Sequence, residues 1–259
     1  PSTGAEGTTG EVAMKGMLTP LRAESLKDVF ISRFEDLILT GRIAIGQKLP
    51  PERELALQLG VSRPVVHEGL LDLAAKGLVT MKPRAGTVVN DYRTHGSLAI
   101  LESLVRYRQG NLEPALLKSL LDTRALVEIE TARLASLNRR TGHLDRFHEI
   151  LELEKSMAPA HLEEITKLDF EFHHLVALAS GNLVYPLLVN SFRQVYTAFT
   201  AIFFSDPAVL PVTFAFHERL VEAIAAKEPE VAQKIMSEVL AHGGAHLLRA
   251  VSGQKGGRP

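Results

Sequence analysis

The chain has no cysteine among its 259 residues. Disulfide frameworks and cysteine-based zinc or redox sites are therefore excluded, and we expect a protein of the reducing cytoplasm. A charge imbalance is missing as well, since 29 Lys and Arg face 30 Asp and Glu. A protein that coats nucleic acid without sequence preference is usually more basic. Any DNA binding must therefore come from a local patch, which favours recognition of specific sites over packaging.

Long apolar runs are also missing. The most apolar run, 195–204, falls well short of the ~20 residues that a membrane-spanning helix needs, so we expect a buried helix and no membrane partner. Residues 1–17 are rich in Gly, Thr, Ser and Ala and lack the apolar core of a signal peptide. We interpret 1–17 and the Gly-rich segment 252–259 as disordered tails.

Apolar spacing and turn signals predict a winged helix-turn-helix domain over 18–90. Thr19-Pro20 has the features of a helix start, with a capping hydroxyl followed by proline, and Gly41 is expected to end this first helix. The other expected elements are helices over 51–59 and 63–76 and a hairpin that pairs 78–81 with 87–90.

The pattern changes after this domain. Residues 91–97 have the composition of a linker, and from 98 to 251 the periodicity is helical throughout, without an alternating strand. An all-α bundle of about seven helices is predicted there. The fold class is therefore mostly α, with a small β-wing in the first domain. The expected helices cover 98–108, 113–138, 142–156, 162–179, 183–204, 209–226 and 229–250.

The turn between the two short helices carries the DNA-binding signal. In a helix-turn-helix the second helix enters the major groove, and its first turn contacts base edges. Ser62 is placed to cap that helix, and Arg63 and Pro64 then lie in its first turn. An Arg at this place can pair with the O6 and N7 atoms of guanine. His67 lies one turn further along the same face.

Further contacts are expected on both sides of that helix. Arg53, at the start of the preceding helix, is placed to bind a backbone phosphate. Arg84, Gly86 and Thr87 form the expected wing tip, where a glycine lets the backbone approach DNA and Arg84 can enter the minor groove. The alternative is that these charges form an ordinary solvated face. The complete spacing from the first helix to the wing favours DNA binding.

A second group of polar residues lies in the helical part. Asp169 and His173 are four residues apart, so their side chains share one face of a helix. His217 lies among apolar neighbours on a later helix, and we expect it to point inward. A buried Asp with two or three inward His residues suits a divalent Zn, Ni, Mn or Fe ion. The alternatives are a metal-free ligand pocket and a buried polar network with a structural role.

Two other function classes have less support. An Asp/His site can activate water, but no additional general base and no nucleophile motif accompany it, so we do not expect an enzyme. A metal-dependent enzyme with a DNA-binding appendage is therefore the weaker alternative. A DNA-architectural protein without a ligand would be more basic than this chain.

Specific segments resemble a known family. Residues 20–90 resemble the DNA-binding domain of the GntR family of bacterial transcription regulators, through L-P-P-E-R-E-L-A, V-S-R-P-V-V and P-R-A-G-T-V-V. Residues 98–250 resemble the all-helical effector (FCD) domain of its FadR-type subfamily, through L-A-I-L-E-S-L, L-D-F-E-F-H-H-L-V-A-L-A-S-G-N and F-H-E-R-L-V-E-A-I. The resemblance covers nearly the whole chain outside the tails.

The resemblance implies a ligand-responsive transcription regulator that acts as a homodimer on an inverted-repeat operator. Repression is the more frequent mode in the family, so we expect a repressor. An effector would favour a dimer geometry that does not match the operator spacing. The family positions that match Arg53, Ser62, Arg63 and residue 67 contact DNA, as does the wing. Position 67 is usually Arg, and His67 lacks the fork of an Arg side chain.

The resemblance also implies a metal. Many members of the subfamily hold a divalent ion with one Asp and three His, and the ion helps to bind a small carboxylate effector. Asp169, His173 and His217 match the Asp and the first two His positions. Val239 occupies the position of the third His, and we expect His242, one helical turn later, to complete the site.

The resemblance implies two alternative hypotheses for the effector. In the first, Arg124 matches an Arg that lines the effector cavity and clamps a carboxylate together with the metal site. An ion pair between Arg124 and Glu128, four residues on, is the alternative for that side chain. In the second reading the chain belongs to the fatty acyl-CoA-responsive branch, which lacks the metal and binds a long acyl thioester in the same bundle. Segments 98–104 and 179–182 resemble that branch.

Overall fold

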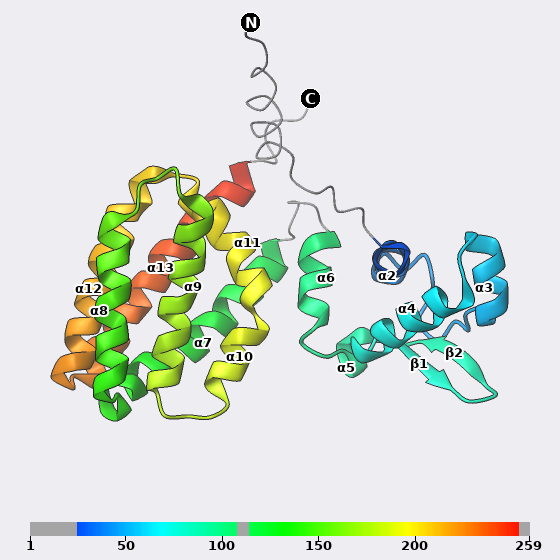
Figure 1. The fold of residues 1–259 in the computed structure, drawn as a ribbon, viewed down its shortest axis with the longest axis horizontal. Helices are drawn as coiled ribbons and strands as arrows, with labels where there is room; N and C mark the ends of the chain where they lie inside the picture. The colour runs from blue at the N-terminus through cyan, green and yellow to red at the C-terminus, as the bar shows by residue number, and fades with distance from the viewer. Residues whose placement is uncertain (1–24, 108–113, 254–259) are drawn as a thin grey trace, which may run out of the picture. The chain divides into compact units, whose positions relative to one another are not determined.

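The computed structural model describes residues 25–107 and 114–253. Backbone contacts divide the chain into two compact units, with the boundary between Asp91 and Tyr92. They are the N-terminal unit and the C-terminal unit (Figure 1). The predicted tail over 1–17 lies outside the described residues.

The described part of the N-terminal unit holds three helices and a two-stranded hairpin. Its elements are α2 (Leu26–Leu39), α3 (Glu52–Leu59), α4 (Arg63–Ala75), β1 (Val79–Lys82) and β2 (Gly86–Val89). Ser25 caps α2, because its hydroxyl oxygen accepts a hydrogen bond from the backbone N–H of Asp28 at 3.1 Å. The predicted helix start at Thr19-Pro20 lies outside the described residues. The predicted order of three helices and a hairpin is confirmed.

A close crossing of α2 and α4 builds the core of this unit. A Cβ atom on Gly69 would lie 2.3 Å from Cδ1 of Phe30, so only glycine allows the two helices to approach this far. Phe30 and Phe34 stack with ring centroids 4.4 Å apart. Gly60 then ends α3 at a φ of 66°, a conformation that glycine adopts without steric cost, and the chain turns there into α4.

The hairpin is a short wing. Val79 pairs with Val89 and Lys82 with Gly86, and Lys48 forms an isolated bridge to Val88 on the free side of β2. The strands lie within one residue of their predicted positions. A hydrogen bond of 3.1 Å from the Ala85 N–H to the Lys82 carbonyl closes the turn between them.

The C-terminal unit is helical throughout its described residues. Its elements are α5 (Tyr92–His95), α6 (Ile100–Tyr107), α7 (Pro114–Asn138), α8 (Thr141–Ser156), α9 (Leu162–Ala179), α10 (Tyr185–Ser191), α11 (Arg193–Phe204), the 3-10 turn η1 (Pro207–Val209), α12 (Leu210–Ala226) and α13 (Pro229–Gly253). Three details differ from expectation. Part of the predicted linker 91–97 is helical, as α5. Phe192, with φ −93° and ψ 0°, interrupts the single helix expected over 183–204. The last helix continues to Gly253, into the segment expected as a tail.

The arrangement of the long helices puts α9 in the interior of the bundle. The helix α7 packs against α13 and α9, and α9 also contacts α8, α10 and α11 (Figure 1). Most of α9 is consequently buried, including Phe170 and Phe172, and only a stripe that includes Glu163, Lys167 and Glu171 is exposed. Any polar residue on the buried faces of α9 must find its partners inside the protein.

In the described part of the chain, no single helix has both the length and the apolar composition to cross a membrane. Only α11 taken together with the segment 207–226 reaches both, and the two are bent by 99° relative to each other.

Candidate DNA-reading surface and candidate metal and effector site

The first turn of α4 is exposed. Arg63 and Pro64 are its first two residues, and both side chains are accessible to solvent. Ser62 is the N-cap residue, as expected from the sequence. Its side chain, however, makes no capping hydrogen bond, so the predicted capping role of the hydroxyl is wrong. That hydroxyl lies at the surface beside Arg63.

Glu52, a residue that sequence reasoning did not select, links the expected reading residues. Its Oε2 atom accepts a hydrogen bond from Nε of Arg63 at 3.0 Å, and its Oε1 atom lies 2.8 Å from Nδ1 of His67. The hydrogen bond with His67 is the largest of the effects that lower the pKa of Glu52 below its usual range. Arg63 and His67 are thus held by one ionised carboxylate.

The flanking positions divide into exposed and buried residues. Arg53, on the first turn of α3, is exposed. Arg84 is exposed at the wing tip with a φ of 63°, a left-handed conformation that costs a residue other than glycine about 1 kcal/mol or more. Gly86 has a φ of 95°, and a Cβ there would lie 2.7 Å from Cε of Lys48. Thr87 is buried, with 8% of its surface exposed, so its expected place at the wing tip is wrong.

The second group assembles inside the C-terminal unit. Asp169 and His173 lie on α9 and His217 on α12, and one ligand atom of each lies within 4.8 Å of the others. The Oδ1 atom of Asp169 is 4.0 Å from Nε2 of His173 and 3.7 Å from Nε2 of His217. All three side chains are buried. The sequence prediction that these residues meet is confirmed.

A glutamate holds the outer nitrogen of each imidazole. Nδ1 of His217 lies 2.7 Å from Oε1 of Glu154, and Nδ1 of His173 contacts Oε2 of Glu128. An ionised carboxylate can only accept, so the proton of a neutral His217 imidazole lies on Nδ1 and its Nε2 faces Asp169; the close contact of His173 with Glu128 lacks hydrogen-bond geometry but favours the same tautomer. Metal-binding histidines usually have this kind of outer partner, which fixes the tautomer and the ring orientation.

The arrangement fits a divalent metal ion. Nε2 of His217 is fully buried and makes no hydrogen bond within the described residues. A buried polar atom without a partner is costly, and an ion between Nε2 of His173, Nε2 of His217 and Oδ1 of Asp169 would satisfy it. The other oxygen of Asp169, Oδ2, accepts a hydrogen bond of 2.6 Å from the hydroxyl of Tyr196 and is already occupied.

His242 does not join this group. Its ring lies beside Phe203 and Phe216, with centroid distances of 5.8 Å and 6.1 Å. Its Nε2 atom is buried without a hydrogen-bond partner. Val239, at the position where the resemblance expects a third His, is buried in the apolar cluster that includes Phe172. The structure therefore brings together three of the four expected ligands.

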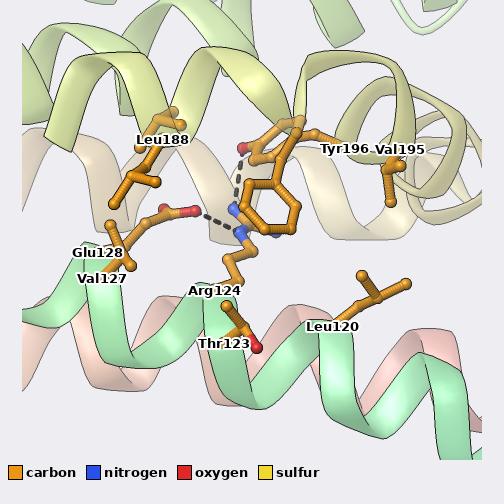
Figure 2. Close-up of a pocket in the computed structure, with 10 residues that line it drawn as sticks. Leu120, Thr123, Arg124, Val127, Glu128, Leu188, Val195 and Tyr196 are labelled. Carbon is orange, nitrogen blue, oxygen red and sulfur yellow. Dashed lines mark hydrogen bonds and ion pairs between the residues drawn. The ribbon is translucent and has the colours of Figure 1, made fainter. Parts of the chain in front are cut away.

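Arg124 connects the candidate metal site to a small cavity. Its Nε atom donates to Oε1 of Glu128 at 2.6 Å, and a terminal amino group donates to the Tyr196 hydroxyl at 2.8 Å (Figure 2). The ion pair that the sequence offered for this residue is thus present. These three side chains line a cavity of about 50 Å³. The other lining residues are Leu120, Thr123, Val127, Leu188, Val189, Phe192 and Val195.

Burial and charge act against each other on these residues. Burial alone would raise the pKa of Glu128, but Arg124 and then His173 lower it to about 2. Burial alone would lower the pKa of His217, yet Glu154 and then Asp169 raise it above its usual value. For Tyr196, burial is the largest of the effects that hold the pKa well above the usual range, so the phenol stays protonated and donates to Asp169.

Two family models match the chain. The model described as "Bacterial regulatory proteins, gntR family" matches residues 29–89, and "FCD domain" matches 119–242. The fatty acid metabolism regulator protein of Erwinia tasmaniensis is 31% identical over 75% of this chain and 79% of its own length. The chain belongs to the GntR family of bacterial transcription regulators.

Other similarities agree with this assignment. The HTH-type transcriptional regulator Mce2R of Mycobacterium tuberculosis is 29% identical over 92% of this chain and 98% of its own length. The solved structure of Lar, which controls the expression of the Listeria monocytogenes agr system, is 18% identical, covers 88% of this chain and 99% of its own, and has a TM-score of 0.61. That likeness shows a shared fold.

This GntR-family chain is a ligand-responsive, DNA-binding transcription regulator of the FadR type rather than an enzyme. It pairs a winged helix-turn-helix with an FCD effector domain. FCD domains commonly bind metal, and the Asp169, His173 and His217 group offers the donor atoms for one.

Proposed function

We propose that this regulator represses its target genes as a homodimer on an inverted repeat and is released by a small carboxylate bound beside a divalent metal. The observation that carries the metal part is the convergence of two Nε2 atoms on Asp169, with each Nδ1 held by a glutamate. Nε2 of His217 has no hydrogen-bond partner among the described residues and lies 3.7 Å from Oδ1 of Asp169, so an ion between them would satisfy both.

In this proposal Asp169, His173 and His217 hold the ion, and Glu128 and Glu154 orient the two imidazoles. One carboxylate and two imidazoles suit Zn, Ni, Mn or Fe. Such an ion supplies a positive charge that attracts an anionic oxygen of the effector. With only three protein ligands at the site, coordination positions remain for that oxygen.

Arg124 is the second anchor for the effector. Its guanidinium lines the cavity, and its hydrogen bonds to Glu128 and Tyr196 fix its direction. A carboxylate can pair with the remaining N–H groups of a guanidinium that is already oriented. The cavity of about 50 Å³ has room for a small effector, and a second cavity of about 650 Å³, which Arg124, Leu121 and Leu240 also line, could hold a larger one.

At the other end of the chain, Arg63 and Pro64 would enter the major groove, with Ser62, Arg53 and the wing residues Arg84 and Gly86 on the backbone or minor groove. The effector would favour a dimer geometry in which the two reading helices no longer match the operator spacing. Only an effector that binds the two geometries with different affinity can do this.

A second candidate is a metal-free regulator that responds to acyl-CoA. Two observations favour it: Val239 stands where the resemblance expects a third His, and a relative at 31% identity is named a fatty acid metabolism regulator protein. In this case Asp169 and the histidines form a buried polar network without an ion.

Operator release separates the candidates. The preferred duplex is first selected from a random library by the wild-type protein, and its affinity is then measured by fluorescence anisotropy. The proposal is supported if a pool of small hydroxy, sugar and dicarboxylic acids releases the metal-loaded protein from the duplex and does not release Asp169→Ala. Release by long-chain acyl-CoA from chelator-treated protein, with no response to the acids, establishes the second candidate instead.

A further inference from the structure

The residue that joins the two expected base-reading side chains is Glu52, the first residue of α3. Its side chain is 21% exposed, whereas those of Arg63 and His67 are 71% and 50% exposed. The carboxylate therefore sits behind two outward-facing groups, and each of its oxygens contacts one of them. A carboxylate is also favoured at this place because it lies at the positive end of the α3 dipole.

The contact with Arg63 leaves a defined set of donors. Glu52 Oε2 accepts from Nε of Arg63 at 3.0 Å. The two terminal amino groups of the guanidinium then remain as a planar fork, which matches O6 and N7 of guanine. Without this contact, a side chain that is 71% exposed would sample many rotamers, and DNA binding would have to order it at an entropic cost.

The contact with His67 defines a tautomer. Because the ionised Glu52 carboxylate only accepts, the proton of a neutral His67 imidazole resides on Nδ1, 2.8 Å from Oε1. Nε2 then faces outward as an acceptor. In the major groove, acceptors match the amino groups of adenine N6 and cytosine N4, whereas an Arg at this place would match guanine.

We propose that Glu52 is a specificity-determining positioning residue, which presents Arg63 as a donor fork for guanine and neutral His67 as an acceptor for an amino-bearing base. Glu52 acts through these two side chains and does not itself touch a base. The inference rests on the proposed role of α4 as the reading helix.

The effect of Glu52→Gln on DNA binding depends on whether Glu52 acts only through its negative charge or by positioning Arg63 and His67. Removal of a negative charge near DNA strengthens binding to any sequence through the phosphates. Loss of a positioning contact weakens binding to the preferred sequence only. Glu54→Gln is the matched control, because it removes the same charge from the same helix, and the Glu54 carboxylate instead accepts a hydrogen bond of 2.9 Å from Nε2 of Gln58.

The experiment measures the Kd of full-length wild type, Glu52→Gln and Glu54→Gln for the duplex that wild type selects from a random library and for a scrambled duplex. Equal melting curves by circular dichroism show that each variant folds. We expect the ratio of the two affinities to fall by about tenfold or more in Glu52→Gln and to stay unchanged in Glu54→Gln. An unchanged ratio in Glu52→Gln, or an equal fall in Glu54→Gln, overturns the proposal.

Two further readouts exclude a general structural effect. The first is a double-mutant test. When Arg63 is already replaced by Ala, Glu52→Gln should lower the ratio of the two affinities by a smaller factor than it does in wild type. An equal factor overturns the proposal. The second readout repeats the selection from the random library with the variants. Glu52→Gln should lose sequence preference at the same base pairs as Arg63→Ala and His67→Ala, and a loss at other base pairs contradicts the proposal. If wild type itself selects no sequence, the proposed reading role of α4 fails. A selecting wild type with an unaffected Glu52→Gln refutes only the part assigned to Glu52.

Discussion

The charged residues of the two candidate sites lie in opposite environments. In the N-terminal unit Arg53, Arg63 and Arg84 project from the surface, whereas in the C-terminal unit Glu128 and Glu154 are 3% and 2% exposed. Exposed cations are accessible to a large polyanion such as DNA. Buried carboxylates are accessible only to small ligands, and they destabilise the fold unless they are paired. The contrast assigns the recognition of a macromolecule to one unit and of a small ligand to the other.

The largest expected effect is the loss of a buried partner. Glu154→Ala should lower the free energy of unfolding by about 3–5 kcal/mol, because it leaves Nδ1 of His217 buried without an acceptor. Chemical denaturation monitored by circular dichroism measures the change. The matched control is Glu152→Ala on the same helix, whose exposed side chain pairs with Lys155. If both variants lose equally little, the Glu154–His217 contact does not stabilise the bundle.

The next effect concerns acid pH. Arg124 and then His173 hold the pKa of Glu128 at about 2 in the folded protein, below its ordinary value of 4.5, so the ionised form stabilises the fold above pH 4.5. This stabilisation, up to about 3 kcal/mol, is lost as the pH falls from about 4.5 toward about 2. Denaturant midpoints measured across this window should fall for wild type and fall less steeply for Glu128→Gln. Equal slopes for both proteins would mean that Glu128 is not ionised in the bundle.

A smaller effect is expected at the reading surface. Arg63→Ala should cost about 1–3 kcal/mol in binding to the preferred duplex and leave the free energy of unfolding nearly unchanged, since the side chain is exposed. Anisotropy titrations and thermal melts measure the two quantities. Arg219→Ala, in the C-terminal unit, is the control for charge. Retained preference in Arg63→Ala would remove α4 from the role of reading helix.

The smallest effect is expected for an ion pair that is exposed at the surface. Glu163→Ala breaks an exposed pair with Lys167 and should change the free energy of unfolding by less than about 0.5 kcal/mol. A loss comparable with that of Glu154→Ala would erase the distinction between buried and exposed charges on which the comparison depends.

The two units also differ in how much the sequence could predict. The reading surface is continuous in the chain, so Ser62, Arg63 and His67 could be placed from one helix and its turn. Glu52 lies on another helix, and its contacts depend on the angle between α3 and α4. Thr87 was misplaced because it was assigned to the tip although it already pairs with Met81 in β2, where alternation along the strand puts its side chain on the same buried face as Val89.

For the candidate metal site, the sequence predicted the ligands but not most of the residues that hold them in place. Asp169 and His173 share a helix face by spacing alone, and His217 follows from its apolar neighbours. Glu154 and Tyr196 come from two other helices, and no local pattern connects them to the site. The spacing of Arg124 and Glu128 was the one available signal for the outer contacts.

Metal content tests the central claim most directly. The measurement uses untagged wild type purified without chelator, with Asp169→Ala and the surface variant Glu163→Ala alongside, by elemental analysis of protein of known concentration. The account predicts about one divalent ion per chain in wild type and Glu163→Ala, and none in Asp169→Ala. Absence of metal from all three, also after incubation with Zn, Ni, Mn or Fe and desalting, would contradict the metal site and leave the buried group as a metal-free network.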